Sequence, residues 1–250
     1  MQWIIIIAII VGGIWLNSSG IITAVSKAKA EEKEVLDRRK RGKTQEQKDI
    51  IDFLYIDPNG CNFSNVVNSD MTIQDYEQIV ARKLYNLDLK QRAIEKIGLD
   101  ESEIEEIEPI PLSGYVFDES DKNVMIKATN NSAVSSRFSV TWIFFSKTQM
   151  YTYTYTFETI SDNVWETTRD FFYQDVTCMT MQQRIVEKID SLPSGCFSNK
   201  EAYVKNNFLV DTLEIVVPGA DYTFSMRNNE DLERSLRAAK AMLRERKYIH

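Results

Sequence analysis

The segment Tyr151-Thr-Tyr-Thr-Tyr-Thr-Phe157 alternates aromatic residues and threonines without a break. Successive side chains of a β-strand point to opposite faces, so this pattern predicts a strand with one aromatic face and one hydroxyl face. The preceding run Phe138–Phe145 also alternates, and Ser146-Lys-Thr-Gln149 supplies turn residues between the two runs. We therefore expect a β-hairpin whose aromatic face is buried and whose hydroxyl face contacts water.

The aromatic face of this hairpin has two possible roles, a ligand platform or a sheet face covered by a helix. A suitable amphipathic helix is expected further along the chain, over Asn229–Lys247. Its apolar residues recur at helical spacing and form one stripe; they are Leu232, Leu236, Ala239 and Leu243. Since aromatic side chains dominate burial in protein cores, we favour the covered face.

Turn residues divide the rest of the C-terminal half into further strands. The expected strands run from Val164 towards Met181 and over Val204–Val210, Thr212–Val217 and Tyr222–Met226. The predicted fold class is therefore α+β. It combines an antiparallel sheet or barrel of about six or seven strands with one C-terminal helix that closes it.

This order of elements resembles the bacterial pleckstrin-homology-like (PH-like) fold. Four segments are also similar to a family of uncharacterised bacterial membrane-anchored proteins; they are Ala93–Pro109, Val140–Ser146, Phe171–Thr177 and Val216–Gly219. The resemblance covers roughly residues 90–248. It implies the sheet or barrel with its closing helix, but it implies no activity, because a fold does not determine a function.

Phosphoinositide binding is the best-known use of the PH-like fold, and its members achieve it with basic residues around the loop between the first two strands. The corresponding stretch here is 127–137, with one basic residue at each end, Lys127 and Arg137. Two charges in an acidic chain make a weak phosphate site. The sequence therefore argues against phosphoinositide binding.

The N-terminus is apolar almost throughout, and its first charged side chain is that of Lys27. A helix that spans a bilayer needs about 20 residues, so the sequence predicts a transmembrane anchor over 1–25. A secretory signal peptide is the alternative, but the positive n-region and a good cleavage site are missing; whether the segment is cleaved stays open. The predicted anchor residues are Trp3, Ile4, Ile5, Ile6, Ile7, Ile9, Ile10, Val11, Ile14, Trp15 and Leu16.

Basic residues follow the predicted span and none precedes it. By the positive-inside rule, the protein is then a single-pass protein of the cell membrane whose soluble body faces the cytoplasm. Cys61, Cys178 and Cys196 are odd in number and lack metal-ligand spacing. They fit buried or free thiols in a reducing compartment.

Four regions follow from these patterns: the anchor 1–25, a charged linker 26–49, a helical region 50–112, and the PH-like β domain with its C-terminal helix, 113–250. Within the helical region, Thr72 and Asp75 form a capping-box pattern that predicts a helix start. Gly98 predicts the end of a second helix over Leu89–Ile97. The glutamates of 101–108 lack the calcium-loop pattern, so no metal or other cofactor is expected.

Composition excludes several classes of function. The net charge of −7 argues against nucleic-acid binding, which depends on neutralising phosphates. The one histidine, His250, is the last residue, which removes histidine-based catalysis and most metal sites from the body of the chain. We therefore expect a membrane-tethered, non-catalytic module that binds a protein partner.

The alternative function is a histidine-independent enzyme, or a binder of a small ligand or lipid at the membrane surface. Asp170 and Asp175 are a candidate acid–base pair. On one continuous strand, however, positions five apart lie on opposite faces. A deep polar pocket with perturbed carboxylates would favour the enzyme, whereas an exposed apolar groove or an unpaired strand edge would favour the protein-binding module.

Overall fold

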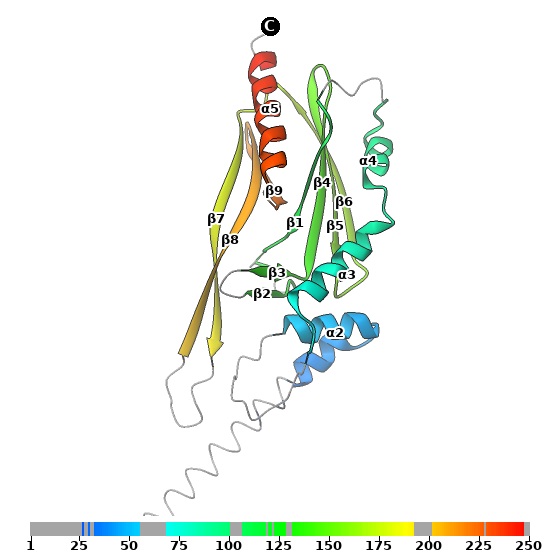
Figure 1. Ribbon diagram of the computed structural model, residues 1–250, viewed down its shortest axis with the longest axis vertical. Helices are drawn as coiled ribbons and strands as arrows, with labels where there is room; N and C mark the ends of the chain where they lie inside the picture. The colour runs from blue at the N-terminus through cyan, green and yellow to red at the C-terminus, as the bar shows by residue number, and fades with distance from the viewer. Residues whose placement is uncertain are drawn as a thin grey trace, which may run out of the picture.

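The computed structural model describes residues 27, 30, 33–55, 69–100, 107–118, 120, 121, 123–128, 132–192, 202–227 and 229–247. Within these ranges it is an α+β structure with one four-stranded, one three-stranded and one two-stranded antiparallel sheet (Figure 1). The predicted α+β class, the antiparallel strands and the C-terminal helix are therefore confirmed.

Helices α2 (Gln45–Leu54), α3 (Ile73–Tyr85) and α4 (Leu89–Ile97) precede the sheets. The predicted capping box is present at the start of α3, where the Thr72 and Asp75 side chains each bond the other's backbone amide. Helix α4 ends at Gly98, which adopts a left-handed conformation with φ of 77° that favours glycine. Local capping chemistry thus positions both helices as the sequence predicts.

The four-stranded sheet has the order β1-β4-β5-β6. Its strands are β1 (Ile110–Tyr115), β4 (Arg137–Phe145), β5 (Gln149–Glu158) and β6 (Val164–Phe172). The predicted hairpin is its centre, with Phe138 opposite Phe157 and Trp142 opposite Tyr153. In this register the aromatic residues of both strands lie on one face, except Phe145, which shares the other face with the hydroxyl residues, Ile143 and Met150.

The three-stranded sheet has the order β7-β8-β9. Its strands are β7 (Cys178–Leu192), β8 (Ala202–Val217) and β9 (Ala220–Met226), while β2 (Ile126–Ala128) and β3 (Ala133–Ser135) form a separate pair. The strand expected from Val164 towards Met181 is in fact two strands. Conversely, β8 replaces two expected strands, because Asp211 continues the ladder opposite Gln183. The Gln183 side-chain amide also donates to the Asp211 carboxylate at 3.0 Å.

The aromatic face of the hairpin is buried, as predicted, but by the N-terminal helices rather than by the C-terminal helix. Tyr153, Tyr155 and Phe157 share one apolar cluster with residues of α2, α3 and α4. Tyr76 of α3 is fully buried, and its hydroxyl contacts the Ser135 carbonyl and the Thr159 hydroxyl, each at 2.8 Å. The N-terminal helices are therefore an integral layer of the fold.

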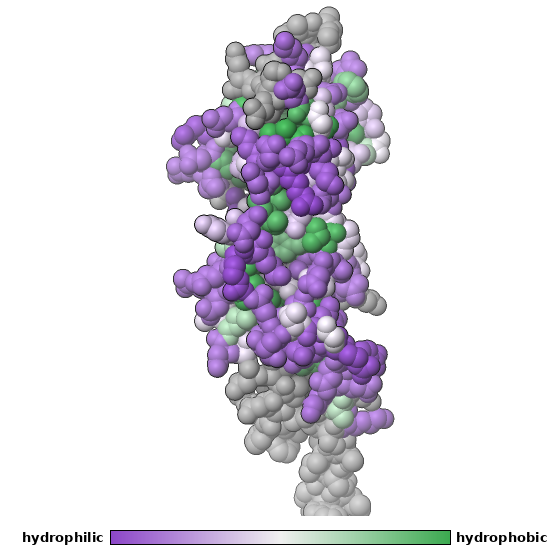
Figure 2. Space-filling view, turned by 90° about the vertical axis from the view of Figure 1, so that its right-hand side faces the viewer, coloured by the Kyte–Doolittle hydropathy of each residue, from purple (hydrophilic) through white to green (hydrophobic). Residues whose placement is uncertain are grey.

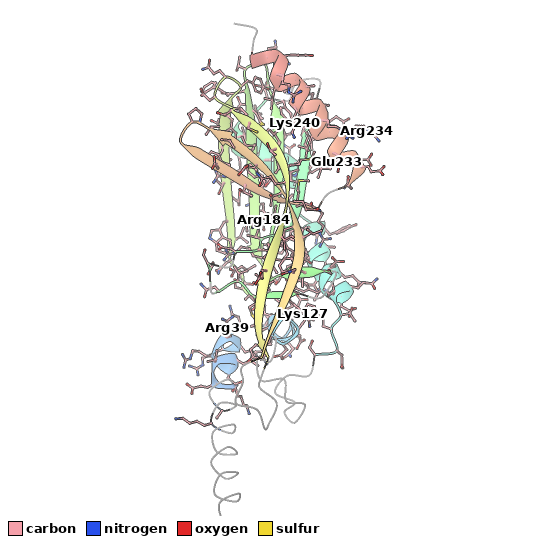
Figure 3. The ribbon with its side chains drawn as sticks, turned by 90° about the vertical axis from the view of Figure 1, so that its left-hand side faces the viewer. Arg39, Lys127, Arg184, Glu233, Arg234 and Lys240 are labelled. Carbon is pink, nitrogen blue, oxygen red and sulfur yellow. The ribbon has the colours of Figure 1, made fainter. Side chains whose placement is uncertain are left out.

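Helix α5 (Glu230–Lys247) packs on the opposite side of the four-stranded sheet. Its Leu236 and Ala239 are fully buried in a second cluster with Ile143 of β4 and Leu213 of β8. Figure 3 shows β7 and β8 in front of the four-stranded sheet, with Glu233, Arg234 and Lys240 on α5 beside them. The helix therefore joins the two sheets at one end of the molecule.

The predicted PH-like barrel is wrong for the described residues, because no sheet closes on itself. Closure would require hydrogen bonds between the consecutive strands β6 and β7. In the described chain, β6 pairs only with β5 and β7 only with β8. The side chains of Phe171 and Met179 pack in the α5 cluster instead, so side chains rather than a strand ladder fill this end.

The predicted transmembrane helix also requires correction. None of the helices in the described ranges combines the length and the apolar content that crossing a bilayer requires. The anchor residues Trp3, Ile4, Ile5, Ile6, Ile7, Ile9, Ile10, Val11, Ile14, Trp15 and Leu16 lie outside these ranges. Within the described residues, the transmembrane, single-pass prediction therefore finds no spanning helix.

The two larger sheets meet where Gly114 of β1 crosses the end of β9. A Cβ atom added to Gly114 would lie 3.0 Å from the backbone nitrogen of Met226, and Arg227 N donates to Ser113 O at 2.8 Å. We expect Gly114→Ala to lower the free energy of unfolding by about 1–3 kcal/mol, because the strand backbones must separate. Urea unfolding measures the change.

Ser113→Ala is the matched control, since it leaves the backbone bond to Arg227 in place. It should change the free energy of unfolding by less than about 0.5 kcal/mol. Equal stability of Gly114→Ala and the wild type would show that the two sheets are not held in close contact at this point.

Candidate functional site

Strand β6 is an open edge of the four-stranded sheet. β5 pairs with one side of it, and no described strand pairs with the other. Three large apolar side chains of β6 are exposed; Val164 is 46% exposed, Trp165 44% and Phe172 52%. A sheet edge with exposed apolar side chains is a ready template for another strand.

The hydrogen-bond pattern shows which peptide groups of β6 are unused. Glu158 N donates to Asn163 O at 3.1 Å, and Tyr173 N donates to Thr148 O at 3.3 Å. Pairing alternates along an antiparallel ladder, so the odd-numbered residues of β6 bond β5. The peptide groups that point away from the sheet are those of Val164, Glu166, Thr168 and Asp170.

A groove of about 460 Å³ adjoins this edge between the hydroxyl face of the sheet and strand β9. Seven hydroxyl side chains line it: Ser139, Thr141, Thr154, Thr156, Thr167, Thr223 and Ser225. Trp165, Arg137 and Arg169 line it as well. The hydroxyl face was predicted to contact water, but Ser139, Thr141 and Thr152 are buried, and the face forms the wall of a groove. Among the described residues, the Thr152 hydroxyl has no hydrogen-bond partner.

Arg137 is held firmly at the groove. Its guanidinium donates to Asp121 and to Glu158, each at 2.8 Å, and its central carbon lies 4.9 Å from the centroid of the Trp165 ring. A cation over an indole face is a favourable contact. Arg137 therefore holds the exposed indole of Trp165 at the rim of the groove.

The carboxylate of Glu158 is the buried counterpart of Arg137. Burial raises its pKa, but hydrogen bonds from Ser161, Arg137 and Asn163 outweigh burial and hold the pKa below its usual value. Glu158 is therefore ionised at neutral pH. It stabilises the Arg137 cation in a place where both side chains are largely withdrawn from water.

On the opposite face of β6, Glu166 is bound by helix α4. Arg92 forms an ion pair with it, Lys96 lies 3.5 Å away, and the Tyr153 hydroxyl donates to it at 3.0 Å. The hydrogen bond from Arg92 is the main reason that the pKa of Glu166 is lowered. Burial, with the bond to Glu166, raises the pKa of Tyr153 to about 12.

Arg169 differs from the other cations at this site. Its guanidinium carbon lies 4.9 Å from the centroid of the Tyr222 ring, and in the described part of the chain it forms no ion pair. It also lines a neighbouring cleft of about 560 Å³ together with Asp170 and Asp175. The turn at 173–175 brings these two carboxylates to one cleft, which a continuous strand would not do.

Acid–base chemistry finds little support at this site. Every carboxyl group whose pKa is displaced within the described ranges has it lowered; these groups are Asp75, Asp118, Asp121, Glu158 and Glu166. A carboxyl group that acts as a general acid near neutral pH needs a raised pKa. Hydrogen bonds and ion pairs within the fold explain the lowered values.

The residues expected around the PH-like loop have structural partners. Lys127 donates to the Phe53 carbonyl at 2.7 Å, and Arg137 bonds two carboxylates. The sequence did not indicate these contacts of Lys127 and Arg137, because each partner is distant along the chain.

Cys178 is an exposed free thiol, while Cys61 and Cys196 lie outside the described residues.

The surface over α3 and α4 is mostly hydrophilic and carries separate hydrophobic patches rather than one broad apolar area (Figure 2).

Comparisons with protein-family models, curated proteins and solved structures give no match for this chain. The geometry of the β6 edge and its groove therefore carries the functional argument.

The Glu158–Arg137 pair predicts a pH-dependent effect. Glu158→Gln should lower the free energy of unfolding at pH 7 by about 1.5–3 kcal/mol, because the hydrogen bonds from Arg137, Ser161 and Asn163 lose their charged acceptor. Asp121 stays paired with Arg137 in this variant. Folding lowers the pKa of Glu158, so its contribution is complete above the unfolded pKa and is lost as pH falls through the folded pKa. The difference between variant and wild type should therefore shrink in acid.

Denaturant unfolding across the acidic pH range measures this difference. Glu34→Gln is the control. The side chains of Arg38 and Glu34 are 70% and 72% exposed, so their ion pair should contribute little to the free energy of unfolding. A destabilisation of Glu158→Gln that stays constant down to strongly acidic pH would contradict the assignment.

Proposed function

We propose that this protein is a non-catalytic binding module that takes an extended segment of a partner protein as an additional strand along β6. The observation that carries the proposal is the row of outward-facing peptide groups from Val164 to Asp170. Strand addition uses such groups for affinity and pockets for alternate side chains for selectivity.

The surroundings of β6 suit this mode of binding. Side chains of an added strand would alternate between the hydroxyl groove and the face that carries Glu166 and α4. Trp165 at the rim of the groove offers a large apolar contact, and Arg137 limits its motion. Both requirements of strand recognition, a backbone edge and side-chain sites, thus occur on one strand.

A small-ligand site is the weaker explanation of the groove. Its volume is within the usual range for ligand pockets, but such pockets are lined mainly by apolar and aromatic side chains. Here hydroxyl groups dominate the lining. Polar, shallow surroundings fit the alternating side chains of a peptide better than a buried small molecule.

A random peptide library displayed on phage tests the proposal with the full chain as target. Selected peptides should slow hydrogen exchange at the amides of Val164, Glu166, Thr168 and Asp170, because these become bonded. The amides of Trp165 and Thr167 already bond β5 and should change little. Enrichment of no peptide, or protection confined to another surface, would refute strand addition at β6.

Thr168→Pro should weaken the binding of selected peptides at least about tenfold. Proline removes the outward N–H of residue 168, yet it leaves the bonds between β5 and β6 intact because this N–H does not bond β5. Thr168→Val keeps the N–H and should bind within about twofold of the wild type. Calorimetric titration measures both, and equal binding by the proline variant would contradict the proposal.

A further inference from the structure

We infer that the segment bound along β6 carries an acidic residue opposite Arg169, followed four positions later by an apolar residue opposite Trp165. This inference rests on the proposed function and specifies the chemistry of the partner. It derives from the spacing of side chains on β6, from the direction of an added antiparallel strand and from the charges that surround the groove.

Trp165, Thr167 and Arg169 alternate along β6 and therefore share its groove face. Their peptide groups bond β5, so in an added antiparallel strand they would sit in non-hydrogen-bonded pairs. Cα atoms of such pairs approach to about 4.5 Å, and their side chains lie on the same face. A residue opposite Arg169 would therefore place its side chain beside the guanidinium.

The charges around Arg169 favour a carboxylate there. In the described chain the guanidinium contacts the ring of Tyr222 but forms no ion pair. Asp170 and Asp175 line the adjoining cleft without pairing with it. The groove's other cation, Arg137, is already matched by Asp121 and Glu158, and Glu166 on the opposite face is matched by α4.

Hydroxyl groups would complete a carboxylate site. Thr154, Thr167 and Thr223 line the same groove as Arg169, and hydroxyl groups can donate to carboxylate oxygens. Bonds between an arginine and a carboxylate are stronger than neutral ones. A lysine at this position of the partner would instead be repelled by Arg169.

Chain direction fixes the order of the two features. An antiparallel strand passes Arg169 before it reaches Trp165, so the acidic residue comes first and the apolar residue four positions later. Thr167 lies between them and would face the residue in the middle of this spacing, where a β-branched side chain packs well. A parallel strand would show the reverse order.

The probe is the capped peptide acetyl-TVETTVFTK-amide, in which glutamate precedes phenylalanine by four positions. Comparison peptides have the glutamate replaced by glutamine or lysine, or have glutamate and phenylalanine exchanged. We expect the glutamate peptide to bind the full chain at least about tenfold more tightly than the others, which corresponds to about 1.4 kcal/mol. Calorimetric titration gives the affinities, and hydrogen exchange locates binding on β6.

Arg169→Gln should abolish the preference for the glutamate peptide over the glutamine peptide. Circular dichroism confirms that this variant folds, and Arg234→Gln, which alters an exposed cation on α5, is the matched control that should keep the preference. A preference that survives Arg169→Gln would overturn the role of Arg169.

The outcomes separate this inference from the proposed function. Equal binding of the glutamate and glutamine peptides with protection of the β6 amides overturns the acidic preference but supports strand addition. Tighter binding of the lysine or exchanged peptide also overturns the inference. Failure of every peptide to protect the β6 amides counts against both the acidic preference and strand addition. Binding of acetyl-glutamate amide alone, lost in Arg169→Gln, would identify a small-anion site and overturn the inference.

Discussion

The register between β4 and β5 is the constraint on which the rest of the structure depends. Phe138 opposite Phe157 and Trp142 opposite Tyr153 place most of the aromatic side chains of these strands on one face of the sheet. A slip of one residue would exchange the aromatic and hydroxyl faces. Because α2, α3 and α4 bury this aromatic face, the register also fixes the position of the N-terminal helices and of the Tyr76 hydroxyl between Ser135 and Thr159.

The same register leaves the other face of the sheet with two different environments. Toward one end, Ile143, Phe145 and Met150 pack with α5 and the second sheet. Toward the other end, Thr141, Thr154 and Thr156 line an open groove, because threonine hydroxyls offer too little apolar area to hold a covering helix. The α5 cluster occupies the closed end, and within the described residues β6 has an unpaired edge beside that groove.

Two arginines show how the fold distinguishes a structural cation from an available one. Arg137 is enclosed by Asp121, Glu158 and the Trp165 ring, and its guanidinium donates to both carboxylates where water is scarce. Arg169 has an aromatic neighbour but, among the described residues, no carboxylate partner. This asymmetry leaves one unpaired cation, Arg169, and one exposed indole, Trp165, at different points of the same groove among the described residues.

Local patterns in the sequence determined the β4–β5 hairpin, the helix starts at Thr72 and Asn229, and the helix end at Gly98, because alternation and capping involve residues close along the chain. Sequence alone predicted one sheet or a closed barrel and assigned the aromatic face to the wrong helix, and it did not single out Arg169 or the β6 edge. Only the tertiary structure decided these features. Whether a strand is left unpaired, and whether a cation meets a carboxylate, depends on segments that are distant in sequence and brought together by packing.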